Sequence, residues 1–221
     1  ENPLQDDKYP EITDVVKNYL NAFLIEDDAK RAETIAQYVG NLYDINSVKQ
    51  RTYVSEYSDV ECYTKKGPYD DTYVVYAYYQ MGLKNIDTTV PAISRLYVVR
   101  DKKTGNVYIQ NDSGDDIQKY MNKVTKDSDV QDLLKDVQEE FESVKASDPK
   151  VKAYYDAINA KANEKKNGTT TGTSNNKNET TASHTSNNAT TKASVTTQAP
   201  TTKVNSTTKP QTTASKNNKN K

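Results

Sequence analysis

One stretch of the chain decides its fold: Thr72-Tyr-Val-Val-Tyr-Ala-Tyr-Tyr-Gln-Met-Gly-Leu-Lys-Asn-Ile86. It is dense in Tyr and Val, the residues that fit a pleated, half-buried surface. A second stretch of the same character follows, Ile93-Ser-Arg-Leu-Tyr-Val-Val-Arg100. We expect the two to form adjacent antiparallel strands joined by a turn at 87–89. Because the first run is longer than a usual strand, we expect strong curvature, with Gly82 as the bend.

Residues on both sides of these stretches extend the predicted sheet. Alternation with a period of two over residues 53–64 predicts one long strand, bulged near Ser58. In simple alternation its odd-numbered residues, among them Tyr57 and Tyr63, share one face. A hairpin loop that ends in glycine leads to a short last strand at 106–110. The sequence therefore predicts an antiparallel meander of about four strands.

Apolar residues at helical spacing flank the predicted sheet on both sides. They mark helices before it, at 12–24 and 29–39, and after it, at 117–124, 128–146 and 149–162. This order predicts an α+β fold in which N-terminal helices pack on a curved meander and C-terminal helices follow it. The last two helices have acidic outer faces, with Asp132, Glu139, Glu140 and Glu142. They either pack on the edge of the domain or stand out as a helical neck that engages a partner.

Composition divides the chain into two parts. All 17 tyrosines lie before Asp156, and no aromatic residue follows Asn163. Residues 163–221 are rich in Thr, Asn and Lys, so they cannot bury enough apolar surface to fold. We therefore predict one domain at 1–162 and a disordered linker or tail at 163–221.

Charge divides in the same way. The tail holds nine Lys and two Glu, a net charge of +7, which leaves −8 for the domain out of a total of −1. An acidic domain without a basic footprint argues against nucleic-acid binding. The tail also carries four Asn-x-Thr sites, at Asn167, Asn178, Asn188 and Asn205. These would be glycan acceptors in a eukaryotic secreted protein, whereas in a bacterium they follow from the composition.

The chain has one cysteine and one histidine, which limits the disulfides and the nucleophilic sites that it can form. Cys62 has no partner for an internal disulfide, and the one histidine, His184, lies in the tail. We expect Cys62 to be a small buried hydrophobe, and a Cys–His nucleophile in the domain is excluded. No run of 18 or more apolar residues is present. Because the chain starts at Glu1 and not at Met, we expect a signal or membrane anchor to precede it.

Several motifs resemble one known family. They are Val60-Glu-Cys-Tyr-Thr-Lys-Lys-Gly67, Tyr73-Val-Val-Tyr76, Asn85-Ile-Asp-Thr88 with Pro91, Leu96-Tyr-Val98 and Gly105-Asn-Val-Tyr-Ile109. Together they resemble the extracellular NTF2-like (cystatin-like) domain of Gram-positive envelope proteins. The sequence departs from that family at Lys66, where the family has proline, and at Ala92-Ile93, where it has a Gly-Leu step.

The resemblance implies a function as well as a fold. It implies a non-catalytic binding or scaffold module on the extracellular side of the membrane or in the cell wall. Its partner would be an envelope protein or a cell-wall polymer, with no cofactor. Membrane association would come from a segment outside this sequence, and the tail would be a spacer. Two alternatives remain open: a small-molecule-binding or isomerase-like enzyme of the same fold, and a component of a conjugation or secretion apparatus.

Tyrosines are the first candidate site. Sheets of this family often curl around a pocket, so the candidate pocket-lining residues are Tyr76, Tyr78, Tyr97, Tyr57 and Tyr63. Alternation puts Tyr73 and Tyr79 on one face of the long strand and Tyr76 and Tyr78 on the other, so one cavity can use only one set. The simpler interpretation is that these are strand residues with buried rings and hydroxyls that reach the surface.

An enzymatic function would need an acid–base group in that pocket. Asp59, Glu61 and Glu56 are the carboxylates of the first long strand. A general base near neutral pH would need a pKa raised by burial, whereas carboxylates on an outer strand face are usually solvated. We assign no catalytic residue.

The acidic loop at 111–116 is a candidate calcium site. It lacks the spacing of an EF-hand loop and the glutamate that follows it. A helix N-cap at Asp115 or Asp116 explains the loop better. We assign no metal site.

Overall fold

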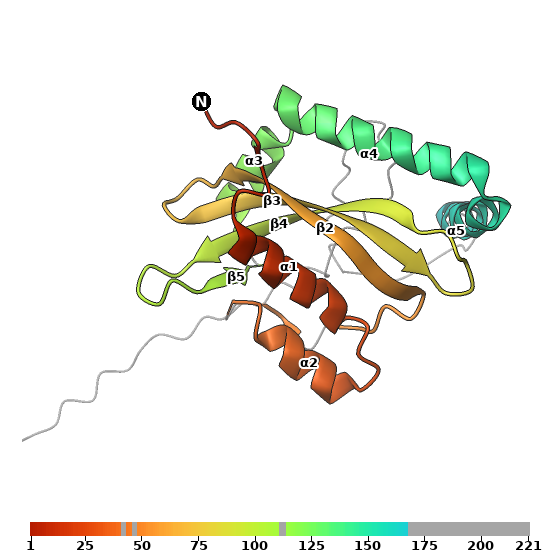
Figure 1. Cartoon of the computed structure of the whole chain (residues 1–221), viewed down its shortest axis with the longest axis horizontal. Helices are drawn as coiled ribbons and strands as arrows, with labels where there is room; N and C mark the ends of the chain where they lie inside the picture. The colour runs from red at the N-terminus through yellow and green to blue at the C-terminus, as the bar shows by residue number, and fades with distance from the viewer. Residues whose placement is uncertain (41–42, 46–47, 111–113, 168–221) are drawn as a thin grey trace, which may run out of the picture.

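The computed structural model describes residues 1–40, 43–45, 48–110 and 114–167. Within this part of the chain an open five-stranded antiparallel sheet is combined with five helices (Figure 1). The strands lie in chain order: β1 (Gln5–Asp6), β2 (Val54–Lys66), β3 (Thr72–Leu83), β4 (Val90–Arg100) and β5 (Val107–Ile109). The helices are α1 (Pro10–Ala22), α2 (Asp28–Ala36), α3 (Asp115–Val124), α4 (Ser128–Ser147) and α5 (Pro149–Asn167). Predictions for the chain from residue 168 onward lie outside the described residues.

Strand β3 is the centre of the sheet, as the opening stretch predicts. Nearly all its side chains are buried on both faces. It pairs with β4 from Thr72↔Val99 to Met81↔Val90, and with β2 along its other edge. The α+β class and the antiparallel meander are therefore confirmed. The sheet has one strand more than predicted, because the two residues of β1 add to the outer edge of β2 at Thr64 and Tyr63.

Strand β2 contains the predicted bulge, and the bulge changes which side chains share a face. Ser58 pairs with Gln80 while Glu61 pairs with Tyr78, so one extra residue is inserted between them. Asp59 takes a left-handed backbone conformation there, with φ of 48°. Side chains before and after the bulge consequently alternate out of phase. The prediction that Tyr57 and Tyr63 share one face is therefore wrong.

A second register shift lies between Val54 and Glu56, opposite Gly82. A Cβ atom on Gly82 would lie 2.6 Å from Ser55 Oγ and 2.8 Å from Glu56 Cγ. Any side chain at position 82 would therefore displace the exposed side chains of Ser55 and Glu56 on the bulged strand. The predicted bend at Gly82 in β3 thus lies opposite the second bulge of strand β2.

Helices cover both faces of the sheet (Figure 1). On one face, α1 and α2 pack over an "α1-side core" that includes Ile12, Val16, Tyr57, Cys62, Tyr73 and Tyr79. On the other, α3 and α4 pack over an "α4-side core" of Val74, Tyr76, Ile93, Tyr97, Met121, Val124, Val130 and Val137. The predicted alternation of the β3 tyrosines between the two faces is confirmed.

The last two helices pack on the domain and do not project from it as a neck. Val130 and Val137 of α4 are buried against the sheet. Phe141 at the far end of α4 meets Tyr155 of α5 edge-on, with ring centroids 4.8 Å apart. Both rings and Val151 belong to the α1-side core, so α5 closes one end of the sheet. No helix of the described residues is long and apolar enough to cross a membrane.

A buried lysine ties the N-terminal segment to the helices. Lys65 of β2 is 3% exposed and forms ion pairs of 2.8 Å with both Asp127 and Asp129. Its ammonium group also donates to the carbonyl of Asn2 at 2.9 Å, and the backbone N–H of Leu4 donates to Asp129 at 2.8 Å. Burial alone would raise the pKa of Asp129, but the bonds from Lys65 and Leu4 outweigh it and hold that pKa below its usual value.

Candidate functional site

Two of the predicted tyrosines are core residues. Tyr76 and Tyr97 are buried in the α4-side core. The Tyr76 hydroxyl shares a 2.8 Å hydrogen bond with Thr125 Oγ1, which satisfies it inside the protein. Burial raises the pKa of both phenols. They stabilise the packing of α3 on the sheet, as the simpler interpretation of these tyrosines expects.

Tyr63 and Tyr78 lie on the same face of the sheet. They are half-buried at the margin of the α4-side core. The Tyr63 hydroxyl donates to Glu61 at 3.0 Å, and the Tyr78 hydroxyl donates to Glu140 of α4 at 3.0 Å. Burial, reinforced by the neighbouring carboxylates, raises the pKa of each phenol to about 12. The Tyr78–Glu140 bond joins α4 to β3 at the surface, whereas the Tyr63–Glu61 bond stays within β2.

The carboxylates proposed for acid–base chemistry face water. Glu56, Asp59 and Glu61 are all exposed. A carboxylate needs burial to become a base at neutral pH. Their position therefore gives the isomerase-like alternative no support.

Tyr57 belongs to a different group, on the α1 side of the sheet, together with an arginine that the sequence did not single out. Arg51 Nη1 donates to the Tyr57 hydroxyl at 2.8 Å. Its Cζ atom lies 4.2 Å from the centroid of the Phe23 ring, a close cation–π contact. The Arg51 backbone N–H also donates to the carbonyl of Phe23 at 3.1 Å. Phe23, at the end of α1, thus fixes both ends of this arginine.

The aromatic layer continues beneath Arg51. Tyr57 meets Tyr79 edge-on, with ring centroids 5.2 Å apart, and the Tyr79 hydroxyl bonds to Ser94 Oγ at 3.0 Å. Burial raises the pKa of Tyr57 to about 12 against the opposing effect of Arg51, so the phenol stays protonated. Among the described residues Arg51 forms no ion pair with a carboxylate. Its charge is stabilised by aromatic rings and hydroxyls instead.

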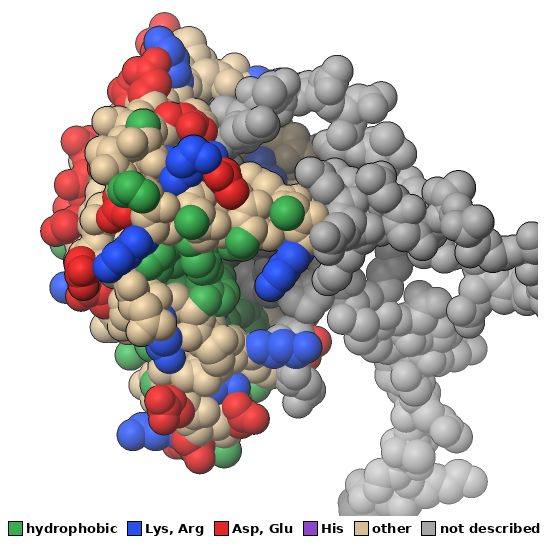
Figure 2. All heavy atoms as spheres, turned by 90° about the vertical axis from the view of Figure 1, so that its right-hand side faces the viewer, with side chains coloured by type: hydrophobic (Ala, Val, Ile, Leu, Met, Phe, Trp, Pro, Cys, Tyr) green, Lys and Arg blue, Asp and Glu red, His purple; other side chains and the backbone are tan. Residues whose placement is uncertain are grey.

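Two exposed apolar side chains lie at the end of the sheet closed by α5. Tyr53 is 40% exposed and Ile158 of α5 is 44% exposed. Burial raises the pKa of Tyr154 and Tyr155, and the nearby Tyr53 hydroxyl raises both further. Figure 2 looks onto this end of the molecule and shows hydrophobic side chains gathered in a hollow, with Lys or Arg side chains along its rim.

We call this group the Arg51 cluster, consisting of Phe23, Arg51, Tyr53, Tyr57, Tyr154 and Ile158. Of its members, sequence analysis proposed Tyr57 alone as a site residue. Arg51 lies in the connector before β2, where no periodic pattern marks it. The signal that could have drawn attention to it is its place between an aromatic-rich helix end and an aromatic-rich strand.

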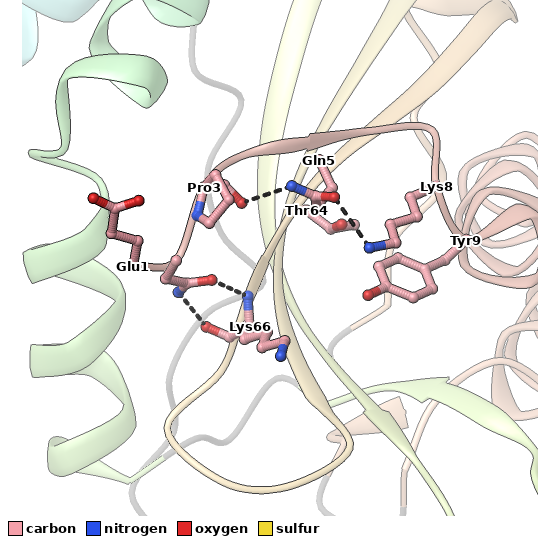
Figure 3. A pocket seen from close by; sticks show the side chains of 8 residues that line it. Glu1, Pro3, Gln5, Lys8, Tyr9, Thr64 and Lys66 are labelled. Carbon is pink, nitrogen blue, oxygen red and sulfur yellow. Dashed lines mark hydrogen bonds between the residues drawn. The ribbon is translucent and has the colours of Figure 1, made fainter.

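A second feature is a small cavity at the opposite end of β2 (Figure 3). It has a volume of about 190 Å³. Its lining residues are Glu1, Asn2, Pro3, Gln5, Lys8, Tyr9, Thr64 and Lys66. None of the predicted pocket-lining tyrosines is among them.

The remaining candidate residues have structural positions. Cys62 is buried and free, and burial raises the pKa of its thiol to about 12, which confirms it as a small buried hydrophobe. Residues 111–113 of the proposed calcium loop lie outside the described residues. The prediction of an aspartate N-cap is wrong, because Gly114 is the N-cap of α3 and Asp115 and Asp116 occupy its exposed first turn. Within the described ranges no three His, Cys, Asp or Glu side chains are grouped to hold a metal.

Comparisons with known proteins give no family for this chain. No protein-family model matches it, and neither a curated protein nor a solved structure matches it significantly.

Proposed function

We propose that this chain is a non-catalytic binding or scaffold module that engages a partner protein through the Arg51 cluster. The observation that carries the proposal is Arg51, held between Phe23 and Tyr57, together with the exposure of Tyr53 and of Ile158 on α5. Tyr, Trp, Phe and Arg are enriched where protein interfaces gain most of their binding energy. The cluster combines three of these four residue types with an apolar helix face.

The arginine is prepared for a partner carboxylate. Its guanidinium is fixed by Phe23 and Tyr57, so little side-chain entropy would be lost on binding. Because it has no ion pair among the described residues, a carboxylate from the partner would complete its coordination. A bidentate pair of this kind is among the stronger polar contacts at interfaces.

The cellular setting is part of the proposal. The module would lie on the extracellular side of a Gram-positive-type membrane or in its wall, attached through a segment outside this sequence. The motif resemblance supports this setting, and so does the Thr/Asn/Lys-rich composition of residues 163–221. The NTF2-like assignment is supported by the same motifs and by helices packed on an antiparallel meander.

Site-specific photocrosslinking tests the proposal. A photoreactive amino acid replaces Tyr53 in the cluster or, in a matched control, Tyr69, which is 59% exposed at the β2–β3 turn. Each full-length protein is incubated with envelopes of the cells that produce it. We expect a discrete crosslinked partner from position 53, absent from position 69.

A second substitution ties the partner to the cluster. Ile158→Ser and Arg51→Gln, introduced into the protein labelled at position 53, should remove the crosslink, while Tyr69→Ser should retain it. Thermal unfolding of each variant shows whether the domain is still folded. Identical crosslinks from positions 53 and 69, or a crosslink that survives Ile158→Ser and Arg51→Gln, would refute the proposal.

A further inference from the structure

The geometry points to a second binding site, for a phosphate group, in the cavity lined by the N-terminal segment and the end of β2 (Figure 3). This site is separate from the Arg51 cluster and does not depend on the proposed function. Three features carry it: a buried hydroxyl without a partner, two lysines without carboxylate partners, and walls fixed by hydrogen bonds.

The hydroxyl belongs to Thr64. This residue is 1% exposed, and its Oγ1 atom is buried with no hydrogen-bond partner among the described residues. A buried hydroxyl that makes no bond is costly to the fold and calls for an explanation. Thr64 is one of the residues that line the cavity, so a small rotation of its side chain would let the buried hydroxyl donate to an acceptor bound there.

Two lysines bring positive charge to the same cavity. Lys8 lies between β1 and α1, and Lys66 ends β2. In the part of the chain that the structure describes, neither ammonium group is paired with a carboxylate. Lys8 Nζ donates to Gln5 Oε1 at 3.1 Å, which orients that carboxamide. Glu1 is the one acidic residue of the lining, so the lining carries net positive charge on an acidic domain.

The cavity walls are held in place before any ligand binds. Asn2 makes two hydrogen bonds of 2.9 Å to the backbone of Lys66, one from its side-chain amide and one to its side-chain oxygen. Gln5 pairs with Thr64 across the β1–β2 ladder. The Tyr9 ring packs on Tyr73 with centroids 4.8 Å apart. A preformed site loses little conformational entropy when it is occupied.

The donor set selects the ligand. The ammonium groups and the hydroxyl all donate, whereas the carboxamide N–H groups of Asn2 and Gln5 already donate within the protein. Charged phosphate oxygens accept such bonds strongly. The ligand is therefore either free phosphate or a phosphate carried on a larger molecule. Inorganic phosphate and glycerol phosphate share this chemistry and distinguish the two sources.

Binding is measured on the full chain by NMR titration with inorganic phosphate and with glycerol phosphate at constant ionic strength. We expect saturable shifts of the Thr64 and Lys66 amide signals. Thr64→Val, Lys8→Met and Lys66→Met should each weaken binding by about tenfold or more, since each removes a bond to a charged oxygen. Lys17→Met, an exposed lysine of α1 outside the cavity, should bind as the unchanged protein does.

The control variants keep the test decisive. Thr64→Val removes a hydroxyl that has no hydrogen-bond partner in the described part of the chain, so the variant should stay folded and report on binding alone. Tighter binding of glycerol phosphate would identify a carried phosphate as the ligand, and tighter binding of inorganic phosphate would identify the free ion. The inference is overturned if neither phosphate saturates the site, if Thr64→Val and Lys66→Met bind as tightly as Lys17→Met, or if sulfate binds equally well.

Discussion

Replacing Lys65 by methionine should destabilise the domain by about 2 kcal/mol at pH 7. The substitution keeps the apolar stem but removes three contacts of the ammonium group: 2.8 Å to each of Asp127 and Asp129, and 2.9 Å to the Asn2 carbonyl. Breaking a fully buried ion pair costs about 3–5 kcal/mol. The cost here is smaller because the two carboxylates are 43% and 38% exposed, so water can solvate them once Lys65 is gone.

This loss depends on pH with a defined sign. Burial alone would lower the pKa of Lys65, but the bonds to both aspartates outweigh it and raise that pKa above its usual value, while the pKa of Asp129 is lowered. The stabilisation is therefore present between the ordinary pKa values of 3.8 and 10.5. It is lost as the pH falls through the folded pKa of Asp129 or rises through that of Lys65.

Urea unfolding followed by circular dichroism at pH 7 and at pH 3 measures the effect. We expect the difference between Lys65→Met and the unchanged protein to shrink or reverse at pH 3. Lys17→Met, on the exposed face of α1, is the control and should change stability by less than about 0.5 kcal/mol. A difference below about 0.5 kcal/mol at pH 7, or one that is the same at both pH values, would contradict the assigned role of Lys65.

Three further outcomes follow from close contacts and burial. Gly82→Ala should cost about 1 kcal/mol in urea unfolding, because a Cβ would lie 2.6 Å from Ser55 Oγ and displace that side chain; unchanged stability would show that the Ser55 side chain moves aside freely. Tyr76→Phe should cost about 1 kcal/mol, and a double-mutant cycle with Thr125→Val should assign that loss to their 2.8 Å bond; additive effects would argue against the bond. Burial raises the pKa of Cys62 to about 12, so a thiol reagent at pH 8 should label it only after unfolding, and rapid labelling of the native protein would rule this out.

The sequence predicts those parts of the fold that a local pattern encodes. The Tyr- and Val-rich run of β3 is buried on both faces, and each predicted helix is present, because apolar spacing reports directly on which side of an element is covered. Strand β1 has no such pattern. The residues just before it are held by Lys65 at Asn2 and by Asp129 at Leu4, contacts that join distant parts of the chain.

The candidate site is harder to predict, for a related physical reason. Alternation assigns faces correctly along β3, but in β2 the bulge at Asp59 reverses it, and so Tyr57 and Tyr63 lie on opposite faces. Arg51 becomes informative only when folding places it on Phe23. Such clusters depend on packing between separate elements, which periodicity within one element does not contain.

The irregular edge of β2 has a consequence for self-association. Beyond Tyr63 and Thr64, which pair with β1, the outer edge of this strand has no strand partner among the described residues. A straight open edge of that length would be a template for joining a second molecule. Two bulges bend the edge away from a straight line, and the exposed charges of Glu56 and Asp59 oppose pairing with another strand. The bulges that interrupt the alternation of β2 therefore disfavour edge-to-edge pairing of sheets between copies of the domain.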